Sequence, residues 1–220
     1  MQFVVLQGDG IGPEIVSSAI DIINLIKNKL KIKIDFIDLE IGFSSLKSQG
    51  TTFPKKVLEI CKKSDGIILG PVDHNNYPSE KDGGLNPSGL LRSHLDLYSN
   101  IRPAKTYNNL KSTVDLMDLI IVRENTEGFY ADRNMYVGNG EFLPEPGIGI
   151  AIRKITDKGS KRIALRAFEI ASNLQKNKSK INLHAIHKAN VMKLTDGIFL
   201  NACRKVAKSF PEINYSEMII

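Results

Sequence analysis

Short apolar runs alternate with longer amphipathic stretches along this chain. Residues 3–7 (FVVLQ) are apolar and β-branched, which predicts a buried strand. Apolar residues then recur at helical spacing up to about Leu30, and Pro13 suits the first turn of that helix. Residues 31–40 alternate again as a strand does. The chain therefore begins with a predicted strand–helix–strand order.

The same alternation continues to the end of the sequence. Further helices are expected at 53–64, 90–98, 160–176 and 195–210, and further strands at 65–72, 118–124 and 181–186. This order is typical of an α/β fold with a mostly parallel sheet and helices on both faces. Residues 74–89 form a polar, Gly- and Pro-rich loop of a length that usually serves a site. Residues 134–156 predict a hairpin or an extended arm, and a domain boundary is expected near 100–107.

Composition narrows the class of protein. Hydrophobic residues make up 42% and charged residues 25%, which fits a globular protein, and the net charge is +6. The lysines are scattered without interleaved aromatic residues, so solvated helix faces are favoured over a nucleic-acid surface. Cys61 and Cys203 lack metal-binding spacing and predict buried free thiols. Without a long apolar run or a signal-like start, we expect a soluble cytoplasmic protein that does not bind membranes.

The turn GDGIGPE at residues 8–14 links the first strand to the first helix. Its glycines allow backbone N–H groups to approach a ligand, and a helix N-terminus favours anions. The third glycine of this motif is not at the position that the dinucleotide fingerprint requires, and no Gly-Lys-Ser/Thr follows as in a P-loop. Taken alone, this motif is read as a structural turn more readily than as a binding loop.

The segment HKANVMKLTDG at residues 187–197 lies where the strand at 181–186 passes into a helix. Ligand groups of α/β folds commonly occupy such positions. Lys188 and Asn190 are therefore candidates, and burial in a crevice is expected to lower the pKa of Lys188. His187 beside them is interpreted as a hydrogen-bonded histidine of the core.

Arginine is scarce in this lysine-rich chain, which draws attention to Arg92, Arg102 and Arg123. Guanidinium groups bind carboxylates through two parallel hydrogen bonds, as lysine cannot. Three of them could hold a substrate with two or three carboxylates, although each alone fits an unrelated salt bridge equally well. Tyr130 lies seven residues beyond Arg123 in RENTEGFY; it is a candidate proton donor, or a packed core tyrosine.

Four motifs, taken in their order along the chain, resemble the isocitrate/isopropylmalate dehydrogenase family. They are GDGIGPE, the arginines ten residues apart ending in NIRP, RENTEGFY and HKANVMKLTDG. That family also includes homoisocitrate and tartrate dehydrogenases, and the resemblance extends from Phe3 to the end of the chain. It implies an α/β fold that is not a Rossmann fold, with two domains and a β-arm for dimerisation. It also implies oxidative decarboxylation of a 2-hydroxy acid with NAD or NADP and with Mg²⁺ or Mn²⁺.

The resemblance assigns roles to individual residues. Tyr130 would donate a proton to the enolate, and Lys188 would handle the hydroxyl proton in the site of a partner subunit. Asn190 and Ile11 would contact the cofactor. The residues that would bind substrate carboxylates are Arg92, Arg102 and Arg123.

Residues just before Arg92 bear on the choice of substrate. Isopropylmalate enzymes have a leucine-rich approach at this point, whereas Asn86 and Ser88 are polar. A polar pocket would house an isopropyl group poorly. We therefore expect an isocitrate-like 2-hydroxy di- or tricarboxylic acid, with isopropylmalate, homoisocitrate and tartrate as the other candidates.

By the resemblance, residues 1–99 are the first part of a large cofactor-side domain, and 100–220 are a small domain with its dimerisation arm at 134–156. The family's metal-binding aspartates are expected beyond Ile220, so no metal ligand is assigned within this sequence. The chain is accordingly expected to be truncated at its C-terminus and inactive alone, and to form homodimers or larger assemblies. The alternative is a non-catalytic regulatory or remnant subunit that acts with a full-length homologue.

Overall fold

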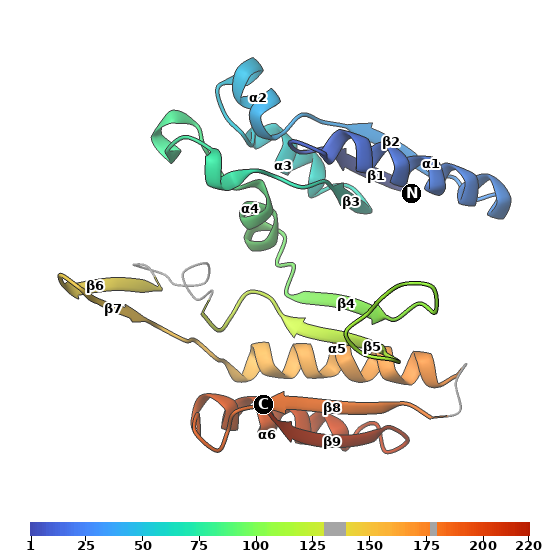
Figure 1. Cartoon of the computed structure of the whole chain (residues 1–220), viewed down its shortest axis with the longest axis vertical. Coiled ribbons are helices and arrows are strands. Elements are labelled where there is room, and N and C mark those ends of the chain that lie inside the picture. Colours follow the sequence, from blue (N-terminus) through green and yellow to red (C-terminus); the bar gives the residue numbers. More distant parts are fainter. Residues whose placement is uncertain (130–139, 177–179) are drawn as a thin grey trace. The chain divides into compact units, whose positions relative to one another are not determined.

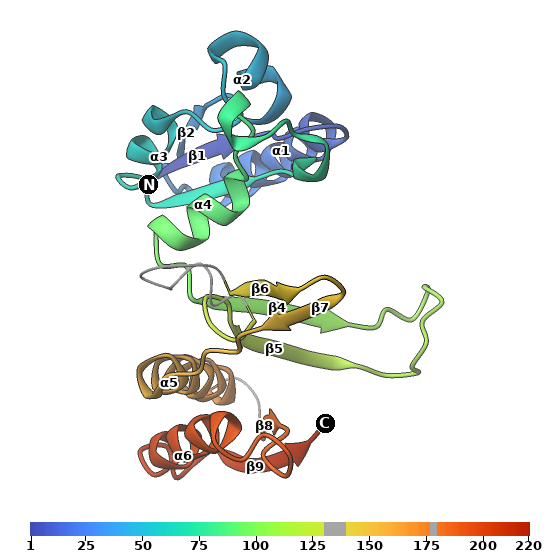
Figure 2. The same cartoon turned by 90° about the vertical axis from the view of Figure 1, so that its left-hand side faces the viewer.

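The computed structural model describes residues 1–129, 140–176 and 180–220. These residues form two compact units, 1–95 and 96–220, shown in Figure 1 and from a second side in Figure 2. Each unit has its own sheet or sheets and its own hydrophobic core, so each is described by itself.

The first unit is built on a three-stranded parallel sheet. Strand β1 (Gln2–Leu6) lies between β2 (Asp35–Asp38) and β3 (Gly66–Leu69). Parallel neighbours need crossover connections, and helices supply most of them. The helices of this unit are α1 (Gly12–Leu30), α2 (Gly42–Gln49), α3 (Lys55–Cys61) and α4 (Pro87–His94), with 3₁₀ turns at His74–Asn76 and Glu80–Asp82.

Helices lie on both faces of this sheet. Val4 and Leu6 of β1 pack in one cluster with Val57 of α3 and Leu91 of α4. Successive strand residues face opposite sides, so Val5, which is 2% exposed, points to the other face. On that face α1 contributes the buried Val16.

The rest of α1 departs from the sequence-based expectation. Its apolar stripe predicts a buried face along the whole helix, yet Ile22, Leu25 and Ile26 are 49–70% exposed. The reason is length. A helix of 19 residues spans about 28 Å, whereas the five-residue strand beneath it spans about 17 Å. The sheet of this unit is too short to cover the second half of α1.

The second unit combines two antiparallel strand pairs with a parallel pair. Strands β4 (Ser99–Lys105) and β5 (Asp118–Glu124) are antiparallel, as are β6 (Glu141–Glu145) and β7 (Ile148–Ala151). Helix α5 (Asp157–Gln175) leads to β8 (Asn182–His187), helix α6 (Thr195–Ala207) and β9 (Asn214–Ile219), which pairs in parallel with β8.

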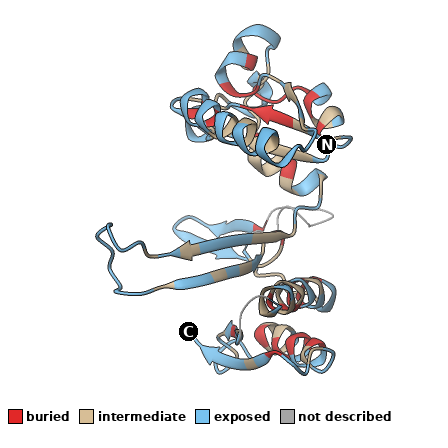
Figure 3. Ribbon diagram, turned by 90° about the vertical axis from the view of Figure 1, so that its right-hand side faces the viewer, coloured by how far each residue is buried: buried red, intermediate tan, exposed pale blue. Residues whose placement is uncertain are grey.

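The core of the second unit lies between α5, α6 and the β8–β9 pair. Phe168 of α5 is fully buried and packs on Phe210 and Tyr215, with ring centroids 5.3 and 5.6 Å away. Figure 3 shows buried residues on β1 and on segments around it in the first unit, and along α5 and α6 in the second, whereas β4 and β5 are mostly exposed.

The expected α/β class with a parallel sheet is confirmed, and so are the free, buried cysteines. Three elements were missing from the sequence reading: α2, β4 and β9. Helix α4 also begins at Pro87 rather than at residue 90, inside the segment read as a loop. The described part of the predicted arm is the β6–β7 hairpin. No helix of the described residues is long and apolar enough to cross a membrane.

Candidate functional site

Arg92 lies in the last turn of α4, in the first unit. Asn86 caps this helix, and its side-chain oxygen accepts a hydrogen bond of 3.1 Å from the Gly89 N–H. One turn later the Arg92 Nη2 donates to the Ser88 hydroxyl at 2.7 Å. The sequence motif therefore folds into a capped helix, and Ser88 contacts Arg92 directly while Asn86 fixes the start of the helix.

Arg102 and Arg123 come from neighbouring strands of the second unit. Arg123 of β5 pairs with Asn100 of β4, so the two side chains point to the same face of the strand pair. Arg102 is two residues beyond Asn100 and shares that face, and its Nε donates to the Asn100 side-chain oxygen at 2.8 Å. Diagonal neighbours of this kind lie about 7–8 Å apart. Two exposed arginines thus stand side by side on one surface.

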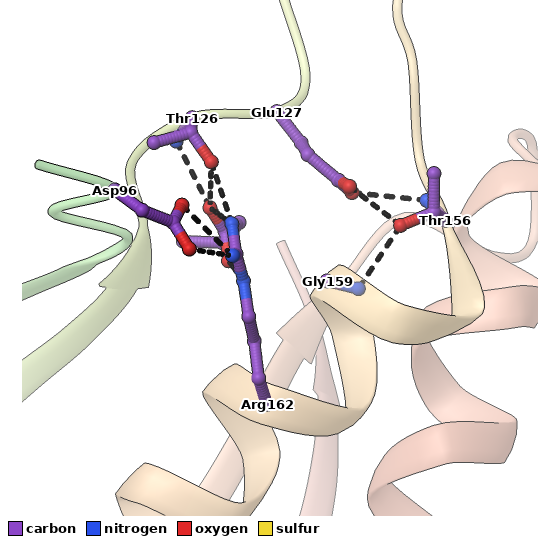
Figure 4. A network of polar contacts seen from close by, with 7 residues as sticks. Asp96, Thr126, Glu127, Thr156, Gly159 and Arg162 are labelled. Carbon is purple, nitrogen blue, oxygen red and sulfur yellow. Dashed lines mark hydrogen bonds and ion pairs between the residues drawn. The ribbon is translucent and has the colours of Figure 1, made fainter. Parts of the chain in front are cut away.

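The turn after Arg123 is held by Arg162 of α5, as Figure 4 shows. The Arg162 Nε and Nη2 donate to the two oxygens of Glu124 at 2.9 and 3.0 Å. Its Nη1 contacts both oxygens of Asp96 at 3.0 Å, and Nη2 also donates to the Thr126 hydroxyl at 2.6 Å. The guanidinium lies over the ring of Tyr98, 4.4 Å from its centroid. One cation therefore joins the ends of β4 and β5 to α5.

A second set of contacts holds the next residues of the turn to the start of α5. The Glu127 carboxylate accepts hydrogen bonds from the N–H and the hydroxyl of Thr156, at 2.9 and 2.5 Å. The Thr156 hydroxyl in turn caps α5 by accepting from the Gly159 N–H at 2.9 Å. Gly128 forms a bridge with Lys154 through both backbone groups. The chain is thus fixed up to two residues before Tyr130, which lies outside the described residues.

Lys188 directly follows β8, at the strand end where the sequence motif predicts it. Its backbone N–H donates to Asp196 at 2.6 Å, and its Nζ donates to the carbonyl of Ile220. The side chain is exposed, contrary to the burial that we expected. Strand β8 pairs with β9 on one side only among the described strands, so its end is open to solvent. Asn190 lies exposed in the turn that follows.

His187, the last residue of β8, has a structural role in this turn. Its Nδ1 accepts a hydrogen bond of 3.0 Å from the Ala189 N–H, which agrees with the expected hydrogen-bonded histidine.

The glycine-rich turn in the first unit is organised by Asp9. Its carboxylate accepts hydrogen bonds from the N–H groups of Phe43 and Asp73, at 2.8 and 3.0 Å, and from the Tyr77 hydroxyl. Burial and the neighbouring Asp9 carboxylate raise the pKa of Tyr77 far above its usual value. Ile11 stands next to this turn at the start of α1 and is 60% exposed, available to a ligand.

Carboxylates, histidines and cysteines do not gather in a metal-binding group of three or more anywhere in the described ranges. The described residues therefore offer no group to which a divalent cation is assigned.

The sequence reading missed five charged residues that support the candidate side chains. Glu124 and Glu127 belong to the motif RENTEGFY and Asp196 to HKANVMKLTDG, so both motifs contained the signal. Arginine scarcity could have pointed to the other two, since this chain has eight arginines among its 30 cationic residues. The five residues are Glu124, Glu127, Arg153, Arg162 and Asp196.

Comparison with known proteins identifies the class to which this fold and these motifs belong. Residues 2–220 match the family model described as isocitrate/isopropylmalate dehydrogenase. A 3-isopropylmalate dehydrogenase of Saccharolobus solfataricus is 36% identical over 216 residues, which are 98% of this chain and 58% of that protein. An isocitrate/homoisocitrate dehydrogenase of Thermus thermophilus is 32% identical over 98% of this chain and 59% of its own length.

A solved structure gives the same result. The isocitrate dehydrogenase of Methylococcus capsulatus superposes with a TM-score of 0.78 and 29% identity, over 99% of this chain and 60% of that one. The chain therefore belongs to the isocitrate/isopropylmalate dehydrogenase family, as the motifs indicated. It spans about 60% of the length of the relatives that it matches. Relatives with different substrate names match at similar identity, so the choice of substrate depends on the site.

Proposed function

We propose that this protein acts in the oxidative decarboxylation of a 2-hydroxy di- or tricarboxylic acid, with NAD or NADP as the oxidant. The observation that carries the proposal is the pair Arg102 and Arg123 on one face of the β4–β5 pair. Two cations at diagonal positions match two carboxylates of one small molecule. Family membership supplies the reaction type.

Arg92, Arg102 and Arg123 bind substrate carboxylates in this proposal. Each charge-assisted hydrogen bond contributes about 1.5–3 kcal/mol, and a guanidinium orients a carboxylate as well as neutralising it. Ser88 is already hydrogen-bonded to Arg92, so it both fixes that arginine and keeps the helix surface polar. With Asn86, it favours an isocitrate-like substrate over one with an isopropyl group.

Proton transfer is assigned to Tyr130 and Lys188. When bound, NAD or NADP would accept the hydride that leaves C2 on oxidation, and Lys188 would take the proton of the 2-hydroxyl. Loss of CO₂ from the resulting 3-carboxy-2-ketoacid leaves an enolate, and Tyr130 donates the proton to its carbon. Asn190 and Ile11 would contact the cofactor. Lys188 is exposed in this chain, which suits its proposed action in the site of a partner subunit.

The assembly and the setting of the enzyme follow from the same proposal. The hairpin within residues 134–156 joins its counterpart in a second copy, so the working form is a homodimer or larger. The protein is cytoplasmic, and its ligand is a small 2-hydroxy acid rather than a nucleic acid or a membrane.

Mg²⁺ or Mn²⁺, when bound, supplies a Lewis acid for the 2-hydroxyl oxygen, and no residue of this chain is assigned as its ligand.

Ligand binding tests the carboxylate site without requiring turnover. Isocitrate, isopropylmalate, homoisocitrate and tartrate are titrated into the chain by calorimetry, with and without Mn²⁺. We expect isocitrate to bind more tightly than isopropylmalate, and Arg102→Lys or Arg123→Lys to weaken binding by about tenfold, because lysine keeps the charge but loses the two-point contact.

Arg166→Lys is the matched control, since Arg166 is an exposed arginine of the same unit on α5. Equal weakening by this control, or no binding of any of the four acids, would refute the carboxylate site. The reduction of NAD⁺ or NADP⁺ is followed in parallel with each acid. Turnover by the 220-residue chain would establish the reaction directly and contradict the expectation that it is inactive alone.

A further inference from the structure

Asp196 is a buried carboxylate beside Lys188 that the proposed reaction does not use. It is the second residue of α6 and is 4% exposed. Both of its oxygens are engaged. Oδ2 accepts the hydrogen bond from the Lys188 N–H at 2.6 Å, and Oδ1 accepts one from the Arg153 Nη1 at 2.5 Å. A buried charge persists when it is paired and hydrogen-bonded in this way.

The contacts of Asp196 keep it ionised. Burial by itself raises the pKa of Asp196, but the hydrogen bond from the Lys188 N–H and the Arg153 guanidinium outweigh burial, so the pKa lies below its usual value. The carboxylate is therefore charged near neutral pH, and its bonds to Lys188 and Arg153 are charge-assisted.

Arg153 connects this carboxylate to the base of the β6–β7 hairpin. It lies two residues beyond the end of β7, and its Nη1 also donates to the Thr195 hydroxyl at 2.8 Å. The adjacent Lys154 is bridged to Gly128, and the Ile152 N–H donates to the Gly140 carbonyl at 2.7 Å, so the returning strand of the hairpin is fixed on both sides of Arg153. A continuous set of short contacts runs from the hairpin base through Asp196 to Lys188.

We infer that Asp196 is a positioning residue that holds Lys188 at the end of β8, and that Arg153 links this position to the base of the hairpin. The functional meaning rests on the proposed role of Lys188. The backbone of Lys188 is held while its ammonium group lies at the surface, so a proton-handling group has a defined origin from which to reach a ligand. A displacement of the hairpin base is passed to Lys188 through two hydrogen bonds.

The Lys188 backbone amide reports on this contact directly in ¹⁵N–¹H spectra of the whole chain. A hydrogen bond to a carboxylate moves the amide proton downfield and slows its exchange with solvent. In Asp196→Ala we expect an upfield shift of this signal and exchange faster by about tenfold or more, from the loss of a charge-assisted bond. Asp196→Asn keeps the size and an acceptor oxygen, and is expected to give a smaller change of the same sign.

The link to the hairpin is tested with Arg153→Met and Arg153→Lys. Arg153 does not touch the Lys188 amide, so a shift of that signal in Arg153→Met, restored in part by Arg153→Lys, would support the link. Arg204→Met is the matched control, because Arg204 of α6 likewise pairs with a carboxylate, that of Glu217, and its loss should leave the Lys188 signal in place. Signals of Leu183 and Ala185 in β8 report whether each variant is folded.

Two results would overturn the inference. If the Lys188 amide signal keeps its chemical shift and exchange rate in folded Asp196→Ala and Asp196→Asn, Asp196 does not position Lys188. An unchanged Lys188 amide in Arg153→Met, with only a lower melting temperature, would reduce Arg153 to a stabilising residue. No ligand takes part in these measurements, so failure of acid binding would refute the proposed function while leaving the contact itself intact.

Discussion

Replacing Arg162 by methionine tests the network that supports the turn after Arg123. Methionine keeps much of the side-chain volume but removes the cation. Glu124, whose side chain is 14% exposed, then loses its charged partner and keeps the hydrogen bonds from Thr126. Breaking a buried ion pair costs about 3–5 kcal/mol, and the bond to Asp96, which is 69% exposed, adds less than about 1 kcal/mol. Because Glu124 is not fully buried, we expect the free energy of unfolding to fall by an amount near the lower bound, about 3 kcal/mol.

Urea unfolding followed through the Ile163 and Ala171 methyl signals measures this loss within the second unit. With a denaturant slope of about 1.5 kcal/mol per molar, the midpoint should fall by about 2 M in Arg162→Met. Arg162→Lys should lie between this variant and the unmodified chain, since lysine keeps the charge without the two-point geometry. Arg166→Met is the control one turn along α5, where the pair with Glu169 is about 43–44% exposed, and it should change stability by less than about 0.5 kcal/mol. Equal midpoints for Arg162→Met and Arg166→Met would refute the reasoning.

Three further predictions concern the same unit. Gly159→Ala would place a Cβ 2.5 Å from the Glu127 carboxylate, and loss of that contact and of the helix cap should cost about 1–3 kcal/mol in urea unfolding. Phe168→Ala removes a fully buried ring and should cost about 3–5 kcal/mol, measured in the same way. The folded-state pKa of Asp196 lies below its unfolded value, so its contribution is complete above about pH 4 and is lost as pH falls through the folded pKa. The stability lost on acidification should therefore be smaller in Asp196→Asn, as thermal melts at several pH values below 4 would show; a parallel pH dependence in both proteins would contradict this.

The fold could be predicted where apolar residues form a continuous run or recur at regular spacing. The strand at 118–124 was predicted with its observed bounds, although its expected burial was wrong, since β5 is mostly exposed. Helix α1 was predicted to within a residue and α5 to within three residues at its start, because apolar periodicity marks them directly. Strand β9 (NYSEMI) was missed because polar residues interrupt its apolar ones, so its sequence shows no apolar run. Strand β4 was missed for the same reason, and Pro103 within it argues against a strand unless the strand lies at an edge.

The candidate site could be predicted only as a set of residue types in motifs. The sequence indicated Arg102 and Arg123, but the strand register that puts them on one face is a property of β4, which was not predicted. Burial of Lys188 was expected from its motif and was wrong, since solvent reaches the end of β8. The support given by Arg162 and Asp196 depends on contacts over 38 and eight residues, and spacing along the chain does not encode such contacts.

Arginine side-chain NMR tests the central claim, a carboxylate site on the β4–β5 pair, most directly. The Nε–H signals of the eight arginines are followed while isocitrate is added to the whole chain. The account predicts that the signals of Arg102 and Arg123 move together and saturate with one dissociation constant, while the Arg166 signal stays in place. Movement of all exposed arginines in proportion to added anion, or no movement of Arg102 and Arg123, would contradict it.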